Sequence, residues 1–418
     1  MESSLGVLMV TGAYYPEIGG GGATQCRGVI RSLKNQLQFT VLTTCVDPRL
    51  PRQSDVENVP VYRVPVNIRR FWSKALAAIR LSSLFIRLRR RFDVVHFHGF
   101  SQKVTVLTVL AKVFKKRLVT TMHAAGLDEP QAVRTKGRMG YACYAKSDLF
   151  IGVSQQQRES FRSSGLPLDR LMVIPNGVDV ERFRPGTKEE RIVLRRDLGL
   201  PTSSWVILFV GFFSREKCPQ VLFEAWTRLQ EEGLLPTTLL FVGATHSQHY
   251  EVDPQLADGM RREARARGLA DHIVFIEKTL DIEACYRAAD CFAMPSTREG
   301  LPVSLLEAMA SGLACVVSRL PGVTDTIIQD GVDGLLVEPG DARALEGGLR
   351  RVLQQSALKD ALGAAARQTV AKRFSIEQTA QLHLEAYRRV MGLADGRSRA
   401  HGRVWKEEMW QGIDQRNA

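Results

Sequence analysis

The chain has 418 residues, of which 44% are hydrophobic and 24% charged, and it carries a net charge of +13. These proportions are close to those of ordinary soluble domains and exclude a fibrous or mostly disordered chain, and the lack of any run of about 18 apolar residues argues against a membrane-spanning one. The length exceeds what one hydrophobic core usually serves, so we expect two domains, and the positive charge favours an anionic partner.

Short apolar runs rich in β-branched residues alternate with helix-length amphipathic stretches in the first part of the chain. The runs cover 7–11, 39–44, 94–98, 118–122 and 149–153. Strands separated in this way predict a parallel, doubly wound sheet. Open parallel sheets bind ligands beyond the carboxyl ends of their strands, so we expect site residues in the turns that follow these runs.

A run of four glycines, Gly19 to Gly22, follows the first of these strands. Glycine allows close backbone approach, so the amides of Gly20, Gly21 and Gly22 suit contact with an anion. The run is not a Walker loop, because no Gly-Lys-Ser/Thr follows it, and it does not spell GxGxxG. A flexible loop is the alternative interpretation.

The segment from Arg69 to Arg91 holds eight basic residues and no acidic one. Within it the apolar residues Ala77, Leu81, Leu84 and Leu88 fall on one helical face, and Phe71-Trp72 stands just before the helix. A basic amphipathic helix of this kind suits an anionic membrane surface. The alternative is an ordinary domain helix that packs its leucines on the sheet and leaves its arginines in water.

Three histidines occur near the ends of two successive strands. His96 and His98 share one face of a strand, which suits either a metal site or a buried structural pair, and His123 closes the next strand. The seven cysteines show no zinc-like spacing, and we expect them to be reduced and buried.

The strand pattern starts again after the polar stretch Phe183-Arg-Pro-Gly186. The new runs cover 206–210, 239–242, 273–275, 291–294 and 314–317. We therefore predict an α/β chain of two Rossmann-like domains, 1–185 and 186–374, with the ligand in a crevice between them. A helix at about 375–392 is long enough to return to the first domain, and 395–418 form a polar tail with the isolated Trp405 and Trp410.

Gly211 ends the first strand of the second half and leads into a basic turn, Phe212-Phe-Ser-Arg-Glu-Lys217. Arg215 and Lys217 in such a turn can neutralise a diphosphate leaving group. A solvated turn is the alternative.

The segment Glu299-Gly-Leu-Pro-Val-Ser-Leu-Leu-Glu307 follows an apolar strand and opens a helix. Pro302 suits the first helical position, and the backbone N–H groups around Gly300, Leu301, Pro302 and Val303 suit a phosphate. Carboxylates on either side of that phosphate suit a sugar nucleotide, whose sugar and ribose flank a diphosphate. Alternatively, Glu299 only complements the helix dipole and Glu307 is a solvated surface residue.

Taken together, these segments resemble glycosyltransferase family 4, whose members have two Rossmann-like domains in the GT-B arrangement and retain the anomeric configuration. The resemblance covers 7 to about 391 and is most specific at the Glu-x7-Glu motif, EGLPVSLLE, followed by AMASGLACVVS. Supporting matches are Pro175-Asn-Gly-Val-Asp179, Glu216-Lys217 and Gly331-Val-Asp-Gly334-Leu-Leu-Val.

The resemblance implies a role for each matching residue. Glu299 would contact hydroxyls of the donor sugar, Glu307 the ribose and Lys217 the diphosphate. Gly20 to Gly22 would approach the donor phosphate and the acceptor, and His123 would be the active-site histidine near the transferred sugar. The family usually has an arginine after the glycine at the position of Gly211, whereas this chain has Phe212, so we expect Arg215 to supply that charge. Asp325 stands where glutamate is commoner.

The expected function is retaining transfer of a hexose-type sugar from a nucleoside-diphosphate sugar, such as a UDP- or GDP-sugar, to a hydroxyl of a glycan or lipid-linked acceptor. The chain shows no Asp-x-Asp pattern, so we expect no essential metal and no resident cofactor. The N-terminus lacks the basic region of a secretory signal, so we expect a cytoplasmic protein, in peripheral contact with an anionic membrane through 69–91.

Other functions fit the same fold. A sugar-nucleotide epimerase shares the phosphate-binding logic, a glycan phosphorylase would need a lysine suited to pyridoxal phosphate that we do not identify, and Phe212 would suit a catalytically silent partner subunit. A nucleic-acid-binding protein would fit the charge, but no helix-turn-helix, zinc or RNA-binding motif occurs and the two glutamates would have no explanation, so we expect no nucleic acid. The base and sugar of the donor stay open.

Overall fold

A computed structural model describes residues 5–17, 19–233, 236–246 and 252–393. It divides into two compact units, the first made of Met1–Gly177 with Ile376–Ala418 and the second of Val178–Ser375. The tail expected at 395–418, with Trp405 and Trp410, lies outside the described residues.

The first unit ends at Gly177 rather than at residue 185, because the segment that follows is bound to the second unit. The Val178 amide donates to the Phe374 carbonyl at 2.9 Å, and Arg367 donates to the carbonyls of Val180 and Phe183. Phe183 is buried. These bonds hold 178–185 against the carboxyl-terminal part of the second unit.

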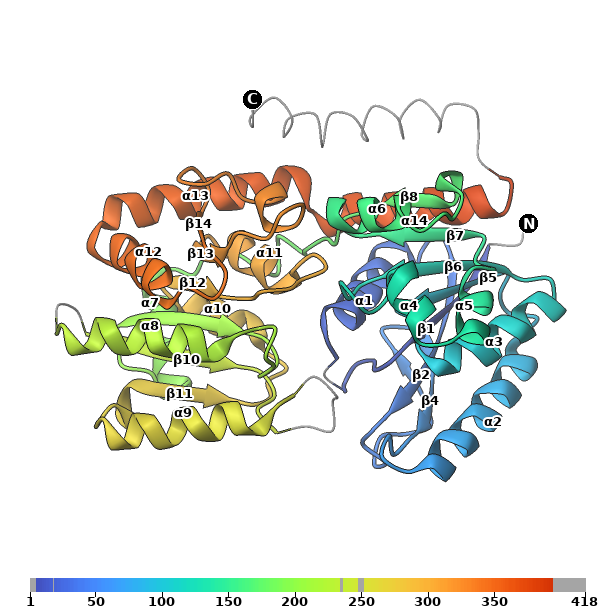
Figure 1. The fold of residues 1–418 in the computed structure, drawn as a ribbon, viewed down its shortest axis with the longest axis horizontal. Coiled ribbons are helices and arrows are strands. Elements are labelled where there is room, and N and C mark those ends of the chain that lie inside the picture. Colours follow the sequence, from blue (N-terminus) through green and yellow to red (C-terminus); the bar gives the residue numbers. More distant parts are fainter. Residues whose placement is uncertain (1–4, 18, 234–235, 247–251, 394–418) are drawn as a thin grey trace. The chain divides into compact units, whose positions relative to one another are not determined.

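The first unit is built on an eight-stranded sheet in the order β3-β4-β2-β1-β5-β6-β7-β8, parallel except for the β3–β4 pair (Figure 1). Its strands are β1 Gly6–Thr11, β2 Gln38–Cys45, β3 Gln53–Val56, β4 Val59–Pro65, β5 Val94–His98, β6 Arg117–Met122, β7 Leu149–Gly152 and β8 Leu171–Val173. Its helices are α1 Gly21–Leu33, α2 Phe71–Leu88, α3 Gln102–Val113, α4 Pro130–Thr135, α5 Arg138–Tyr144, α6 Gln155–Arg162 and α14 Ile376–Val390, with a 3-10 turn at Leu168–Arg170.

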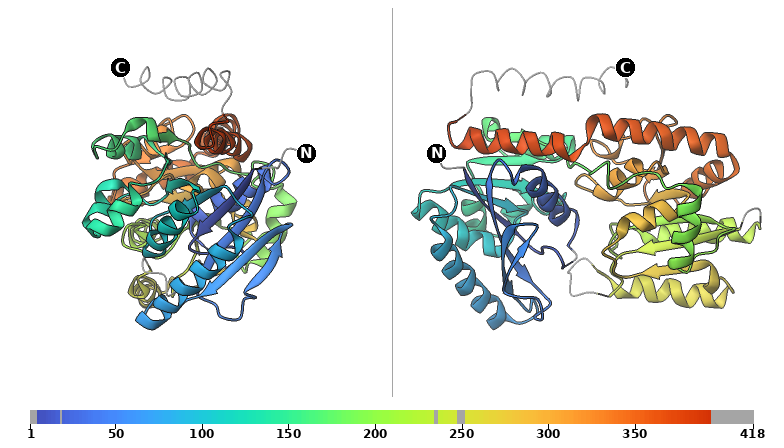
Figure 2. Two further views of the ribbon diagram at one scale, coloured as in Figure 1. Left: turned by 90° about the vertical axis from the view of Figure 1, so that its right-hand side faces the viewer. Right: turned by 180° about the vertical axis from the view of Figure 1, so that it is seen from behind.

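Both faces of this sheet are covered, which explains why its strands are continuous apolar runs. Val7 and Met9 of β1 pack with α1 and α14 on one face, and Leu8 and Val10 pack with α2 and α3 on the other. Helix α14 lies beside α1 (Figures 1 and 2). The last helix that the structure describes therefore completes the core of the first unit.

The second unit has a six-stranded parallel sheet in the order β11-β10-β9-β12-β13-β14. Its strands are β9 Trp205–Val210, β10 Thr237–Val242, β11 Ile273–Ile276, β12 Cys291–Met294, β13 Ala314–Ser318 and β14 Leu335–Val337. Its helices are α7 Lys188–Asp197, α8 Pro219–Glu231, α9 Pro254–Ala266, α10 Ile282–Ala288, α11 Val303–Ala310, α12 Ala342–Gln354 and α13 Ser356–Arg373, with 3-10 turns at Ala270–His272 and Thr324–Thr326.

Local sequence signals fix several helix starts in this unit. Thr187 and Glu190 form a capping box at α7, in which the Thr187 side chain accepts from the Glu190 amide and the Glu190 carboxylate accepts from the Thr187 amide. Asp341 accepts from two amides of the first turn of α12. The two doubly wound sheets confirm the predicted fold class.

Candidate active site

In the second unit the strand order reverses between β9 and β12, which are neighbours in the sheet. The connections after these two strands leave in opposite directions, so a crevice forms at their carboxyl ends. Gly211 follows β9, and the loop from Pro295 to Pro302 follows β12. The basic turn and the start of the Glu-x7-Glu motif therefore meet at the switch point of this sheet.

Lys217 and Glu299 form an ion pair at this point. The Lys217 ammonium donates to both carboxylate oxygens of Glu299, at 2.7 Å to Oε1 and 2.6 Å to Oε2. Glu299 is only 8% exposed, and a carboxylate so buried needs such a partner. The pair is therefore part of a built site, and Glu299 does more than complement a helix dipole.

The two loops that carry this pair are bound to each other. The Glu216 carbonyl accepts from the Thr297 amide at 2.8 Å, and the Glu216 carboxylate pairs with Arg298 at 3.1 Å. Cys218 has a left-handed backbone, with φ of 50°, just before α8 begins at Pro219. Such a conformation costs a residue with a side chain of the order of 1 kcal/mol or more. The surrounding bonds offset that cost and fix the turn that presents Lys217.

Gly211 and Lys217 lie close together, whereas Arg215 lies apart. A Cβ at Gly211 would come within 3.8 Å of the Lys217 side chain. Gly243 packs against the backbone of Gly211 so closely that a Cβ on Gly243 would stand 2.0 Å from the Gly211 carbonyl oxygen. Arg215 is 82% exposed, and its Nε lies 3.4 Å from Asp253 Oδ2. In this structure Arg215 therefore lies in solvent beside Asp253.

Helix α11 begins at Val303, one residue later than predicted, because Pro302 has extended backbone and acts as the N-cap. No side chain caps the helix, so its first-turn amides point toward the crevice without a capping oxygen. Gly300, Leu301, Pro302 and Val303 are all buried. These residues lie together with Glu299 at the helix start.

Glu307 lies inside α11 and is buried, so the alternative of a solvated surface residue is wrong. It is 6% exposed, and burial raises its pKa to about 7. The Tyr286 hydroxyl donates to Glu307 Oε2 at 2.8 Å and, together with the nearby Arg182, opposes that rise. The sequence offered no local signal for Tyr286, which comes from α10 and meets Glu307 only in the fold.

The first unit has its own switch point, between β1 and β5. Gly20 is the N-cap of α1, with no side-chain cap, and Gly21 begins the helix. A Cβ at Gly22 would stand 3.0 Å from Cδ2 of His123, so the helix start packs directly on the imidazole. The glycine run is therefore a helix N-terminus that needs glycine for close packing rather than a free loop.

The histidines stack behind this helix start. His123 Nε2 and His98 Nδ1 are 2.9 Å apart, and the two rings are stacked. His96 uses both ring nitrogens, on Tyr387 and Thr121 at 2.7 Å each, which makes it a structural histidine. Burial lowers the pKa of His123 to about 3 and holds the pKa of His98 and His96 well below the usual value. All three imidazoles are neutral near pH 7.

Two further residues at this edge were missed by the sequence analysis. Asp128 is buried and accepts from the amides of Phe100, His123 and Ala124, so it fixes the turn that holds His123. The Lys103 ammonium donates to the Thr11 carbonyl at 2.8 Å, and burial lowers its pKa to about 8. Asp128 stands five residues after His123, which is the only hint the sequence gives.

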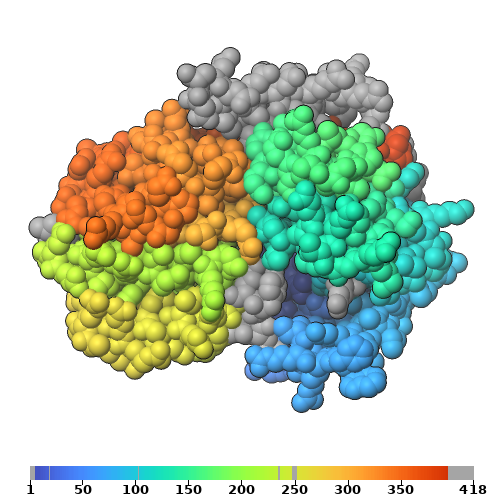
Figure 3. All heavy atoms as spheres, in the orientation of Figure 1, coloured from blue at the N-terminus to red at the C-terminus, as the bar shows by residue number. Residues whose placement is uncertain are grey.

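Helix α2 has two apolar faces. Ala77, Leu81 and Leu88 pack on the sheet, so the ordinary domain-helix alternative is correct for the face that we had considered for the membrane. Helix α2 runs along the outside of the first unit (Figures 1 and 3), and its second apolar face is exposed. Its apolar residues are Phe71, Trp72, Leu76, Ile79 and Ile86, continued on the neighbouring α3 by Val106, Val109 and Val113.

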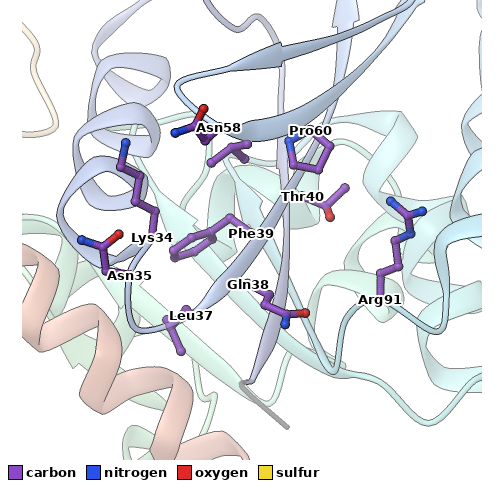
Figure 4. A pocket seen from close by; sticks show the side chains of 10 residues that line it. Lys34, Asn35, Leu37, Gln38, Phe39, Thr40, Asn58, Pro60 and Arg91 are labelled. Carbon is purple, nitrogen blue, oxygen red and sulfur yellow. The ribbon is translucent and has the colours of Figure 1, made fainter.

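A hollow of about 470 Å³ lies at the amino ends of β2 and β4. The glycine run and the histidines lie at the other edge of the sheet, where the parallel strands have their carboxyl ends. Figure 4 shows Phe39 between Lys34 on one side and Arg91 on the other. None of its described lining residues has a buried polar side-chain atom that lacks a partner. We assign no role to it.

Within the described part of the chain, no helix is both long and apolar enough to cross a membrane. In the same residues no three histidine, cysteine or acidic side chains come together as a metal site.

The sequence matches two family descriptions that together span most of the chain. Residues 19–182 match glycosyltransferase family 4, and 190–369 match glycosyl transferases group 1. An uncharacterised glycosyltransferase of Methanocaldococcus jannaschii is 27% identical over 92% of this chain and 98% of its own. A D-inositol 3-phosphate glycosyltransferase of Xylanimonas cellulosilytica is 31% identical over 71% of this chain and 72% of its own. The Escherichia coli UDP-Gal:alpha-D-GlcNAc-diphosphoundecaprenol alpha-1,3-galactosyltransferase is 29% identical over 66% and 71%.

Solved structures show the same fold. The Anabaena protein HepE in complex with UDP-glucose superposes with a TM-score of 0.74 at 17% identity, covering 91% of this chain and 99% of its own. Sucrose-phosphate synthase from Thermosynechococcus elongatus gives a TM-score of 0.76 at 21% identity, covering 93% and 100%. Both are two-domain α/β structures of the same architecture.

Proposed function

Because the chain belongs to glycosyltransferase family 4, with its GT-B fold, we propose that it moves a hexose-type sugar from a nucleoside-diphosphate sugar to an acceptor hydroxyl with retention of configuration. The observation that carries the proposal is the Lys217–Glu299 ion pair at the uncapped start of α11, with Glu307 about one turn further along that helix. A cation, helix amides and two flanking carboxylates match the alternation of hydroxyls and diphosphate in a sugar nucleotide.

In this proposal each residue of the second unit meets one part of the donor. Lys217 and the first-turn amides of α11 bind the diphosphate, Glu299 accepts from sugar hydroxyls and Glu307 accepts from the ribose. When the donor binds, the Lys217 ammonium shares its hydrogens between Glu299 and the phosphate oxygens, which is open to it because it has three donors. Arg215 would reach the phosphates only by leaving Asp253, so we give it an auxiliary role.

The transfer step balances without any further reactant. The bond from the anomeric carbon to the diphosphate oxygen breaks, the bond from that carbon to the acceptor oxygen forms on the same face, and the acceptor proton passes to the leaving diphosphate. The protein stabilises the charge that develops on the diphosphate and positions the acceptor. We assign the acceptor side to Gly20–Gly22 and to the neutral His123, which can exchange hydrogen bonds with a hydroxyl but takes no proton at neutral pH. We propose that no resident cofactor and no divalent ion take part.

A thermal-shift screen tests the donor assignment. Wild type is expected to be stabilised by one of UDP, GDP and ADP, because a ligand held at 100 times its Kd adds about 2.7 kcal/mol. Proton NMR of the product then tests retention, since an α-linked donor must give an α-linked product. Stabilisation by none of the three nucleotides, or an inverted product, would contradict the proposal. An epimerase would instead return an altered sugar nucleotide without releasing nucleotide, and a phosphorylase would consume inorganic phosphate.

For the acceptor we propose a glycan or a lipid-linked sugar, which the E. coli relative's diphosphoundecaprenol substrate supports. A lipid-linked acceptor requires contact with a membrane, and we propose the outward face of α2 and α3 for it. Trp72, Leu76, Ile79 and Ile86 recur at helical spacing on that face, and Trp72 is 81% exposed. The basic residues of 69–91 supply attraction to anionic headgroups.

Vesicle sedimentation tests this surface. The wild type is expected to bind vesicles with 30% anionic lipid and to release from them in high salt. Trp72→Ala with Ile79→Ser should weaken that binding at least fivefold, whereas Val193→Ser, which removes an exposed apolar residue from α7 of the second unit, should not. Equal binding by all three proteins, or none by the wild type, would overturn the membrane assignment.

A further inference from the structure

Tyr286 occupies an unusual position below the donor-side carboxylate Glu307. Its side chain is fully buried, and its ring packs edge-on against Phe183 with centroids 5.6 Å apart. Its hydroxyl lies 2.8 Å from Glu307 Oε2 and 3.2 Å from the carbonyl oxygen of Ser304. The ring is therefore held in place, while the hydroxyl faces two acceptors.

A tyrosine hydroxyl has one proton, so it can donate to only one of these acceptors at a time. An ionised Glu307 is the stronger acceptor and takes the proton on Oε2. The other oxygen, Oε1, has no hydrogen-bond partner among the described residues. A protonated Glu307 would reverse the arrangement, because it would donate to the tyrosine oxygen and turn the hydroxyl proton toward Ser304.

The remaining charged groups around Glu307 do not replace this bond. Arg182 is held by Glu283 through two hydrogen bonds of 3.0 and 2.7 Å. The charge of Arg182 lowers the pKa of Glu307 and the charge of Glu283 raises it, so the two effects oppose each other. From α13, which packs on α11, Arg367 donates to backbone carbonyls. The Tyr286 hydroxyl is thus the direct partner that the structure gives to Glu307.

We propose that Tyr286 is a positioning residue for donor binding: its hydroxyl holds Oε2 of Glu307 and favours the ionised carboxylate, with Oε1 turned to the nucleotide. This inference rests on the proposed function, in which Glu307 receives the ribose. Tyr286 itself touches no substrate in this proposal. It sets the affinity of the site through Glu307, whose carboxylate contacts the nucleotide.

Tyr286→Phe tests the proposal, because phenylalanine keeps the buried ring and removes only the hydroxyl. The probe is whichever of UDP, GDP and ADP binds the wild type most tightly, titrated calorimetrically into the full chain between pH 6 and 8. The variant should bind about tenfold more weakly at pH 7, as expected for a hydrogen bond to a charged group. The nucleotide affinity of the variant should also reach its maximum at a higher pH than that of wild type, because Glu307 ionises less readily without the hydroxyl. The kcat at saturating donor should change less than threefold.

Two further proteins make the result decisive. Tyr387→Phe is the matched control, since it removes a buried hydroxyl that bonds to His96 in the first unit, and its nucleotide affinity should equal that of wild type. Glu307→Gln should show only the pH dependence that the phosphates themselves contribute, and adding Tyr286→Phe to it should weaken binding no further.

The outcomes separate this inference from the proposed function. If Glu307→Gln binds nucleotide as tightly as wild type, the donor assignment itself is wrong. If Glu307→Gln is weakened but Tyr286→Phe matches wild type at every pH, the donor assignment stands and the role of Tyr286 is refuted. Should Tyr286→Phe fail to fold, a wild-type pH dependence no different from that of Glu307→Gln would refute it equally.

Discussion

Replacing Lys217 by methionine removes the ammonium group, keeps most of the side-chain volume and leaves Glu299 without its counter-ion. The two bonds between them, 2.7 and 2.6 Å, are charge-assisted, and the Glu299 side chain is 6% exposed. Unpairing a fully buried charge costs about 3–5 kcal/mol, and losing an exposed pair costs about 0–1 kcal/mol. Because the Lys217 side chain is 27% exposed, we place the loss between these limits, at about 2 kcal/mol.

This loss should be visible in thermal unfolding of the second unit. For a unit of about 150–250 residues each kcal/mol shifts Tm by about 2–4 °C, so Lys217→Met should melt about 4–8 °C below wild type. Adding Glu299→Gln removes the unpaired charge and should return most of that difference. Turnover should fall by about 10²–10³ in the single variant, as when one group that stabilises a transition-state charge is removed, and should not return in the double variant.

Calorimetry and nucleotide release from a sugar nucleotide, measured on the same preparations, give both numbers. We expect stability and activity to separate, with stability recovering in the double variant while activity stays lost. This expectation would be refuted if Lys217→Met melted like wild type, or if the double variant were less stable than the single one.

Three more substitutions test other parts of the site. Gly22→Ala should cut turnover at least tenfold with little change in Tm, because the new Cβ presses on His123 while alanine improves α1; Gly347→Ala, in open space on α12, should leave turnover unchanged. Arg215→Ala should raise the donor KM less than tenfold and leave kcat near wild type, since the side chain is exposed; a loss as large as that of Lys217→Met would show that Arg215 binds the diphosphate. In urea unfolding, the stability of wild type relative to Glu307→Gln should fall as pH rises from about 4.5 to 7, because folded wild type keeps the proton of Glu307 that the unfolded state releases; the rise in stability that the buried histidines contribute over this range is common to both proteins and cancels.

Strands buried on both faces could be predicted from sequence because burial makes them continuous apolar runs. All ten predicted strands occur, with ends that differ by at most two residues. Of the four that were missed, β3, β8 and β14 have only three or four residues each, and the longer β4 is interrupted by Pro60 and Arg63. The β3–β4 hairpin turns at Glu57 and Asn58, both left-handed, without the glycine that would have marked the turn.

The motif placed Glu299, Glu307 and Lys217 in one unit, but their pairing depends on strand order. Lys217 meets Glu299 because β9 lies beside β12, across a long stretch of intervening chain. Tyr286 reaches Glu307 for the same kind of reason, and no spacing rule connects them. Tertiary neighbours of this kind could not be read from local patterns.

Helix α2 shows how periodicity gives an incomplete answer. The sequence left the face of Leu81 open between a membrane surface and packing on the sheet, and this face packs on the sheet. The exposed face of Ile79 was overlooked because the opposite face was more apolar, and only the position of the sheet shows which of the two is covered.

The most direct test of the account is nucleotide release from a panel of UDP-, GDP- and ADP-sugars by the wild type and by Glu299→Ala. Glu299 is the carboxylate that joins the helix start to Lys217, so its loss removes both a contact to the sugar and the partner that holds the lysine. The account predicts release from one donor class by the wild type and almost none by a folded Glu299→Ala. Equal release by both proteins, or none by the wild type from any donor, would contradict it.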